Sequence, residues 1–208
     1  QLILGLAENL EEEQDLAVVH EQARDITEAV KRTSAICRDL TRYARRNGSR
    51  EEVMVNLNTK LDEALRIARY AVTLQDVTVV KRYAEEASVM GNPDELLHVF
   101  VNLITNAVQA IKDHGTLTLQ TAVGPDGLVS ASVSDTGCGI PKEAFSKIFE
   151  PLYTTKPPGK GTGLGLYNVM SVISKMDGHI CVESEVGVGT TFRIEFPQVQ
   201  PTISCAPL

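Results

Sequence analysis

Two hydrophobic periods divide the chain. Between positions 16 and 44 the apolar or small residues recur at alternating steps of three and four, at Leu16, Val19, Ala23, Ile26, Val30, Thr33, Cys37, Leu40 and Ala44. Charged residues occupy the other faces, which an ordinary amphipathic helix would also show, but four unbroken heptads favour a coiled coil or helical bundle. A shorter apolar face over residues 2–10 precedes this stripe, and residues 11–15 are the expected connection, which together predict an antiparallel helical hairpin.

The two helices of this hairpin differ in length. At 1.5 Å per residue the second helix, of roughly 30 residues, is about 45 Å long, whereas the first has only about ten residues. The first helix therefore cannot cover the whole apolar stripe. We expect that it begins upstream of Gln1 and has been cut, and that a second copy of the chain completes a four-helix bundle about a two-fold axis.

From Val53 onwards the pattern changes to short alternating runs typical of strands, interleaved with amphipathic helices. Asn92, followed by Pro93, is typical of a helix start, and this helix is expected to run to about Asp113. Helices are also expected over residues 59–71, after Pro141 and over 163–176, and strands over 53–57, 77–83, 116–123, 128–135, 179–185 and 190–196. The prediction is an α+β fold, a two-layer sandwich in which helices cover one face of a mostly antiparallel sheet. We expect domains at 1–48 and 49–197, and an extended or disordered tail at 198–208.

Composition excludes several classes of protein. The 208 residues carry a net charge of −7, which argues against general nucleic-acid binding. No apolar run approaches the roughly 18 residues of a membrane span, and the apolar start lacks the basic leader of a signal peptide. The four cysteines have no metal-binding spacing, which is typical of reduced thiols in a cytosolic protein.

Four short polar stretches, the islands of this sequence, contain the candidate functional residues. Asn102 and Asn106 lie four apart on one face of an apolar helix, and "DTGCGI" places Asp135 at the end of a strand before two glycines. "FEPLYTTK" offers Lys156 beside two hydroxyls. "GKGTGLGL", residues 159–166, matches neither a P-loop nor a dinucleotide fingerprint, yet it opens a helix whose first N–H groups favour an anion.

In this order and spacing, over roughly residues 53–197, the islands resemble the ATP-binding domain of sensor histidine kinases, in the superfamily shared with gyrase and mismatch-repair ATPases. The wording "NAVQA" with "TTK" is most similar to the nitrogen-regulation and dicarboxylate-sensor branch. The resemblance implies that Asp135 accepts a hydrogen bond from the adenine amino group, helped by the hydroxyl of Thr190, and that Asn106 is the Mg²⁺ ligand. The implied ATP-binding set is Asn102, Asn106, Gln109, Asp135, Gly137, Gly139, Thr155, Lys156, Lys160, Gly161, Thr162, Gly163, Leu164, Gly165 and Thr190.

The resemblance also implies a reaction. Gyrase-type members carry a glutamate base at the position of Asn102, and asparagine is a poor base, which favours phosphoryl transfer over ATP hydrolysis. Residues 1–8 resemble the sequence that follows the phosphoacceptor histidine of the family, which would place that histidine about six residues before Gln1. His20 lacks the family's following residues and is interpreted as a solvated helix position. We therefore expect a chain that binds Mg-ATP but cannot phosphorylate itself.

The expected protein is a cytoplasmic homodimer that passes the phosphoryl group to an aspartate of a response-regulator receiver domain. Contact with a membrane is expected only through upstream parts, and contact with nucleic acid is not expected. Residues 150–162, with three prolines and two glycines, are predicted to form a mobile lid. Two alternatives remain open, a non-catalytic dimeric switch driven by ATP and a gyrase-like ATPase.

Overall fold

The structure, a computed structural model, describes residues 15, 17–24, 26, 27, 30, 52–72, 76–125, 127–157 and 161–197. The chain divides into two compact units, residues 1–49 with 151–164, and residues 50–150 with 165–208. In the first unit the described residues between Ala17 and Val30 are helical, and the Asp15 carboxylate caps this helix by accepting from the Ala17 N–H at 2.9 Å. The first helix of the predicted hairpin, most of its heptad stripe and the predicted tail lie outside the described residues.

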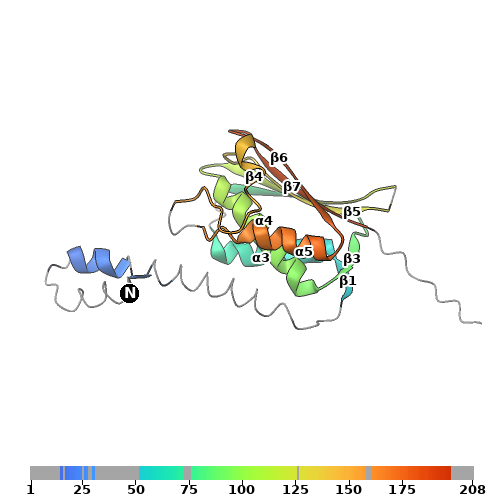
Figure 1. The fold of residues 1–208 in the computed structure, drawn as a ribbon, viewed down its shortest axis with the longest axis horizontal. Helices are drawn as coiled ribbons and strands as arrows, with labels where there is room; N and C mark the ends of the chain where they lie inside the picture. Colours follow the sequence, from blue (N-terminus) through green and yellow to red (C-terminus); the bar gives the residue numbers. More distant parts are fainter. Residues whose placement is uncertain are drawn as a thin grey trace, which may run out of the picture. The chain divides into compact units, whose positions relative to one another are not determined.

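The second unit is a two-layer α+β sandwich, as the sequence predicts. Its elements in chain order are β1 (Val53–Asn56), α3 (Leu57–Ala71), β2 (Val77–Arg82), β3 (Ser88–Gly91), α4 (Pro93–Ala110), β4 (Gly115–Val123), β5 (Val129–Asp135), the 3₁₀ helix η2 (Lys142–Ala144), α5 (Gly165–Lys175), β6 (His179–Glu185) and β7 (Gly189–Phe196). The main sheet has the strand order β2-β4-β5-β7-β6 and is antiparallel except for the β2–β4 pair, while β1 and β3 form a separate two-stranded sheet. Helices α3, α4 and α5 lie on the same side of the main sheet (Figure 1).

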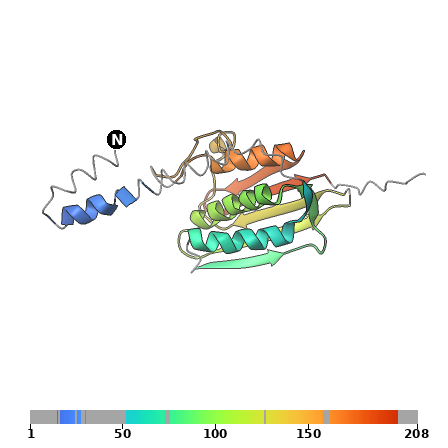
Figure 2. The same ribbon diagram turned by 90° about the horizontal axis from the view of Figure 1, so that it is seen from below.

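The three helices lie side by side across the sheet, with α4 in the middle (Figure 2). Helix α4 therefore buries the widest apolar face, and the side chains of Leu96, Phe100, Leu103 and Ile104 are fully enclosed. Burial of each such side chain stabilises the fold by roughly 1.5–3 kcal/mol. Strand β5 meets this layer with every second residue, from Val129 to Asp135. The last of these inward positions is a carboxylate rather than an apolar side chain.

Several element boundaries differ from the prediction. Helix α4 ends at Ala110 rather than near Asp113, because the Ala110 carbonyl accepts the Cys138 N–H at 3.0 Å and the next residue is extended. Helix α3 begins two residues early, because the Asn56 side chain caps it by accepting from the Thr59 N–H at 3.0 Å. The short helix expected after Pro141 is a single 3₁₀ turn, and β3 was not predicted.

Among the residues that the structure describes, no helix combines the length and apolar character that crossing a bilayer requires.

Candidate active site

The glycine loop, residues 135–140, leaves β5 and packs directly on the end of α4. The Cys138 N–H donates to the carbonyl of Ala110 at 3.0 Å, which satisfies one of the carbonyls that a helix end leaves without a partner. Gly137 lies flush against the same residue, since a Cβ built on it would be 2.6 Å from the Ala110 carbonyl. This close contact fixes the height of the loop above α4.

The other side of the glycine loop rests on the hairpin between β6 and β7. The Gly187 N–H donates to the carbonyl of Cys138 at 2.9 Å. Gly139 has φ of 70°, and a Cβ there would lie 2.1 Å from the Glu185 carbonyl oxygen. Only glycine fits at this position, both because of its left-handed backbone and because the hairpin touches it. The loop is therefore held on two sides by main-chain contacts.

Asp135 and Thr190 lie opposite each other in the β5–β7 ladder, as the implied partnership requires. Both are buried on the helix-facing side of the sheet, with 8% and 4% of their surface exposed. The Asp135 carboxylate accepts the Gly137 N–H at 2.8 Å and also a hydrogen bond from the backbone of Thr190. Burial raises the pKa of Asp135, and these two hydrogen bonds oppose the rise only in part.

The asparagine pair lies one turn apart in the second half of α4, between the middle of the helix and the end on which the glycine loop packs. Asn102 and Asn106 are both half-buried. Gly165, the first residue of α5, lies so near that a Cβ built on it would be 3.7 Å from the Asn102 side-chain oxygen. The free N–H groups of the first turn of α5 therefore lie beside Asn102, where they favour an anion. Gln109 is exposed on the last turn of α4, and Asn102 is about 12 Å along the helix from its end.

The segment of residues 151–164 belongs to the first unit and closes on itself. The Leu152 N–H donates to the Gly163 carbonyl at 3.0 Å, and both residues have left-handed backbones, with φ of 67° and 68°. A Cβ on Gly163 would lie 2.3 Å from the Leu152 carbonyl carbon, so this crossing requires glycine. The two ends of the loop are thus joined at its base.

Within this segment the candidate phosphate-binding residues have different environments. Burial lowers the pKa of Lys156, whose backbone N–H donates to the Thr154 hydroxyl at 3.2 Å. Thr155 is exposed, and the Thr162 hydroxyl accepts from the Leu164 N–H at 3.4 Å. Gly161 is half-buried, and Lys160 lies outside the described residues.

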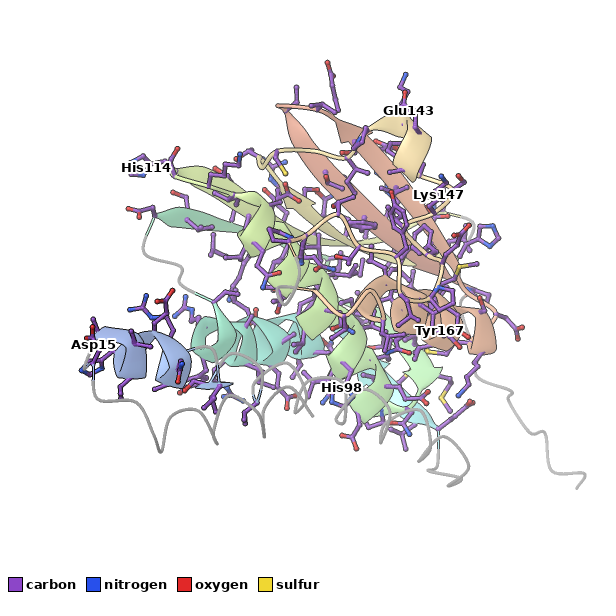
Figure 3. The ribbon with its side chains drawn as sticks, turned by 60° about the vertical axis from the view of Figure 1, so that its left-hand side comes forward. Asp15, His98, His114, Glu143, Lys147 and Tyr167 are labelled. Carbon is purple, nitrogen blue, oxygen red and sulfur yellow. The ribbon has the colours of Figure 1, made fainter. Side chains whose placement is uncertain are left out.

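None of the four histidines belongs to the expected nucleotide-binding set, although His98 lies four residues before Asn102 on α4. His20 is an exposed helical residue, as the sequence predicts. Figure 3 shows His98 in the first half of α4 and His114 just before β4, beyond the other end of that helix, where His114 lies 3.7 Å from the carboxylate of Asp76. The fourth, His179, is exposed at the start of β6.

One polar residue of the site was not found from the sequence. Ser184 lies opposite Thr190 in the β6–β7 ladder, and their hydroxyl oxygens are 2.9 Å apart. A signal was available, because the inward positions of β6 are Ile180, Val182 and then Ser184, and a hydroxyl ends an otherwise apolar series.

Comparison with known proteins places the chain in a family. Residues 91–200 match the family model described as histidine kinase-, DNA gyrase B- and HSP90-like ATPase. The chain is 33% identical to the sensor kinase CckA of Brucella abortus, over 89% of this chain and 22% of that protein. It is 31% identical to the signal transduction histidine-protein kinase AtoS of Escherichia coli, over 94% of this chain and 32% of that protein. The chain thus spans a third or less of the length of these relatives.

Solved structures agree in fold. The catalytic domain of the histidine kinase ThkA superposes with a TM-score of 0.63 at 28% identity, over 72% of this chain and 97% of that domain. The mycobacterial sensor histidine kinase MprB gives the same TM-score at 23% identity, which supports the fold alone. The matched parts include the glycine loop and both asparagines of α4. The chain therefore belongs to the family of histidine kinase-, DNA gyrase B- and HSP90-like ATPases and holds the catalytic core of a sensor histidine kinase.

Proposed function

We propose that this chain binds Mg-ATP, with adenine at Asp135 and Thr190 and the phosphates toward Asn102 and the start of α5. The proposal rests on the placement of two different groups beside α4, a buried carboxylate next to the end of the helix and the N–H groups of α5 next to Asn102. Beside the end of α4, a buried ionised carboxylate can only accept hydrogen bonds, which suits the amino group of adenine and repels the oxygen of guanine. Beside Asn102, the first N–H groups of α5 suit phosphate.

Asn106 is the proposed protein ligand of Mg²⁺. The described residues contain no group of three or more His, Cys, Asp or Glu side chains that could hold a metal ion by themselves. Mg²⁺ does not need such a cage, because it keeps several waters and takes one or two protein oxygens besides the phosphates. The half-buried amide of Asn106, one turn from Asn102, fits that role. When bound, the ion neutralises phosphate charge during transfer.

The proposed reaction is transfer of the γ-phosphoryl group to a histidine. The bond from phosphorus to the bridging oxygen breaks, a phosphorus–nitrogen bond forms, and ADP leaves. Asn102 is a poor general base, so the site lacks at that position a group that would activate water for hydrolysis. The kinase names of the relatives described above support the same reaction. Lys156 and Lys160 of the segment 151–164 are proposed to meet the phosphates.

The phosphoacceptor is proposed to be a histidine other than His20. His20 lies early in the predicted second helix of the hairpin, and roughly 27 residues of helix, about 40 Å, separate it from the end of that helix. Phosphoryl transfer requires reacting atoms within about 3.5 Å. A homodimer through the hairpin and a response-regulator receiver domain are the proposed partners, and the nitrogen-regulation branch remains a prediction.

Labelled ATP tests the proposal. The chain is incubated with γ-labelled ATP, alone and with a purified histidine-kinase hairpin domain that carries its acceptor histidine. We expect acid-labile, alkali-stable label on the supplied domain and none on this chain. ATP binding without any transfer would instead indicate a non-catalytic switch, and rapid release of labelled phosphate would indicate a gyrase-like ATPase. Label on this chain that is lost in His20→Gln would contradict the assignment of the acceptor.

A further inference from the structure

Three strands place a row of polar side chains at the adenine end of the proposed site. Asp135 on β5 is the register partner of Thr190 on β7, which in turn is the register partner of Ser184 on β6. The three strands are neighbours in the sheet (Figure 1). Because register partners point to the same face, all three side chains belong to the helix-facing side. Ser184 is the member to which no role has been given above.

The hydroxyl of Ser184 has three partners within hydrogen-bond distance. Its oxygen accepts the Ile140 N–H of the glycine loop at 2.8 Å. It lies 2.8 Å from the carbonyl oxygen of Gly189, which can only accept, so the Ser184 proton belongs to that contact. The third contact, 2.9 Å to the Thr190 hydroxyl, could by itself run in either direction.

The other two contacts decide that direction. A hydroxyl has one proton and two lone pairs. If Ser184 gave its proton to Thr190, two acceptor oxygens would face each other at the Gly189 carbonyl with no proton between them. If Thr190 donates instead, Ser184 accepts twice and donates once, and all three contacts are hydrogen bonds. Thr190 therefore donates its proton to Ser184, and the Thr190 oxygen can only accept further hydrogen bonds.

We infer that Ser184 is a positioning residue that fixes Thr190 as a hydrogen-bond acceptor and so helps the site to select a 6-amino purine over a 6-oxo purine. This inference rests on the proposed function. With Asp135 ionised and the Thr190 proton committed, both groups present only lone pairs. A purine that contacts these groups directly through position 6 must then supply protons, as an exocyclic amine does and a keto oxygen does not.

Removal of the Ser184 hydroxyl frees the Thr190 proton. In Ser184→Ala the Thr190 hydroxyl can turn and donate directly to the 6-oxo group of inosine triphosphate. The ratio of the inosine triphosphate Kd to the ATP Kd is expected to fall by about 2- to 10-fold, the value of one neutral hydrogen bond. The glycine loop also loses a contact at Ile140, but that loss weakens both nucleotides alike and leaves the ratio unchanged.

The experiment measures both Kd values by competition against a fluorescent ATP analogue, using the complete chain. Ser184→Thr keeps a hydroxyl and should retain the wild-type ratio. Ser134→Ala is the matched control, because Ser134 pairs with the Thr191 hydroxyl at 2.9 Å in the neighbouring register position, on the opposite face of the same sheet. It should leave the ratio unchanged. In a Thr190→Val background, Ser184→Ala should have no further effect on the ratio.

The possible outcomes separate this inference from the proposed function. A wild-type chain that prefers ATP, together with an unchanged ratio in Ser184→Ala, overturns the inference and leaves the ATP site standing. A wild-type chain that binds neither nucleotide refutes the proposed function, and the inference falls with it. If Ser184→Ala does not fold, Ser184→Cys supplies a weakly bonding group of similar size, and the same change in ratio is expected.

Discussion

The Asp135→Asn substitution exchanges one carboxylate oxygen for an amide group at the buried end of β5, with almost no change in volume. The remaining oxygen can still accept the Gly137 N–H, now at 2.8 Å. The new NH₂ group then stands where a second acceptor was, facing the donor of an adenine amino group. Donor opposes donor, so the amide cannot replace the carboxylate toward the ligand.

The expected loss of affinity follows from the kind of bond removed. A hydrogen bond to a charged group contributes about 1.5–3 kcal/mol, so the Kd for ATP should rise about 10- to 150-fold. Stability should not fall. Burial raises the pKa of Asp135 above its ordinary value of 3.8, which means that folding disfavours the ionised form. Ionisation therefore removes stability as pH rises through the raised pKa, and the neutral asparagine avoids that cost.

The assay pairs titration of a fluorescent ATP analogue with thermal unfolding of the same two proteins at neutral pH. We expect a large loss of binding with an equal or higher Tm in Asp135→Asn. Wild-type binding should also weaken as pH falls through the raised pKa of Asp135, and the substituted protein should lack that decline. Equal affinity of the two proteins would remove Asp135 from the site, and a Tm lower by several degrees would refute the electrostatic reasoning.

Four further predictions concern other parts of the chain. Because burial lowers the pKa of Lys156, ATP affinity should decline as pH rises through that pKa. Lys156→Arg stays charged and should abolish this alkaline decline in the same titration. Identical pH curves for the two proteins would exclude Lys156 from phosphate binding. Gly139→Ala places a Cβ 2.1 Å from a carbonyl oxygen and should lower the free energy of unfolding, measured in urea, by about 3 kcal/mol or more. Gly187→Ala, with φ of 81° and open space around the Cβ, should lower it by about 1–2 kcal/mol. Equal losses in the two variants would contradict the steric argument. Residues 150–162 should be cleaved by proteases more slowly with a Mg-ATP analogue than without, and unchanged cleavage would count against a lid. The chain should sediment as a dimer through residues 1–46, and a strict monomer with a folded second helix would contradict the bundle.

The sequence predicted the layers of the second unit well because its strands alternate strictly and its helices carry broad apolar faces. Strands β4 to β7 and the start of α4 were placed within about one residue for that reason. The end of α4 was misplaced because its position depends on a hydrogen bond from Cys138, which comes from a loop later in the chain. Strand β3 was missed because four residues give too short a pattern, and only its pairing with β1 makes it a strand.

In the candidate site too, residues with a local motif were predicted, and residues whose role depends on distant contacts were not. Asp135, Thr190 and the asparagines were identified by motif, and the structure adds that the first two are partners in one ladder. The role of Ser184 could not be inferred from the sequence, because it depends on three hydrogen bonds, to β7 and to the glycine loop. The sequence signal was only that a hydroxyl ends the apolar series of inward positions in β6.

The glycine loop, held between α4 and the β6–β7 hairpin, ties the proposed nucleotide site to the folding of the whole second unit. Its two anchors, Ala110 and Gly187, are distant in sequence, so the loop takes its shape only after both segments have docked. Unfolded chain therefore has no affinity for the nucleotide, and ligand at 100 times its Kd adds about 2.7 kcal/mol to stability. Nucleotide supply would thus set how often this unit opens, and how long the protein survives proteolytic turnover, independently of any phosphoryl transfer.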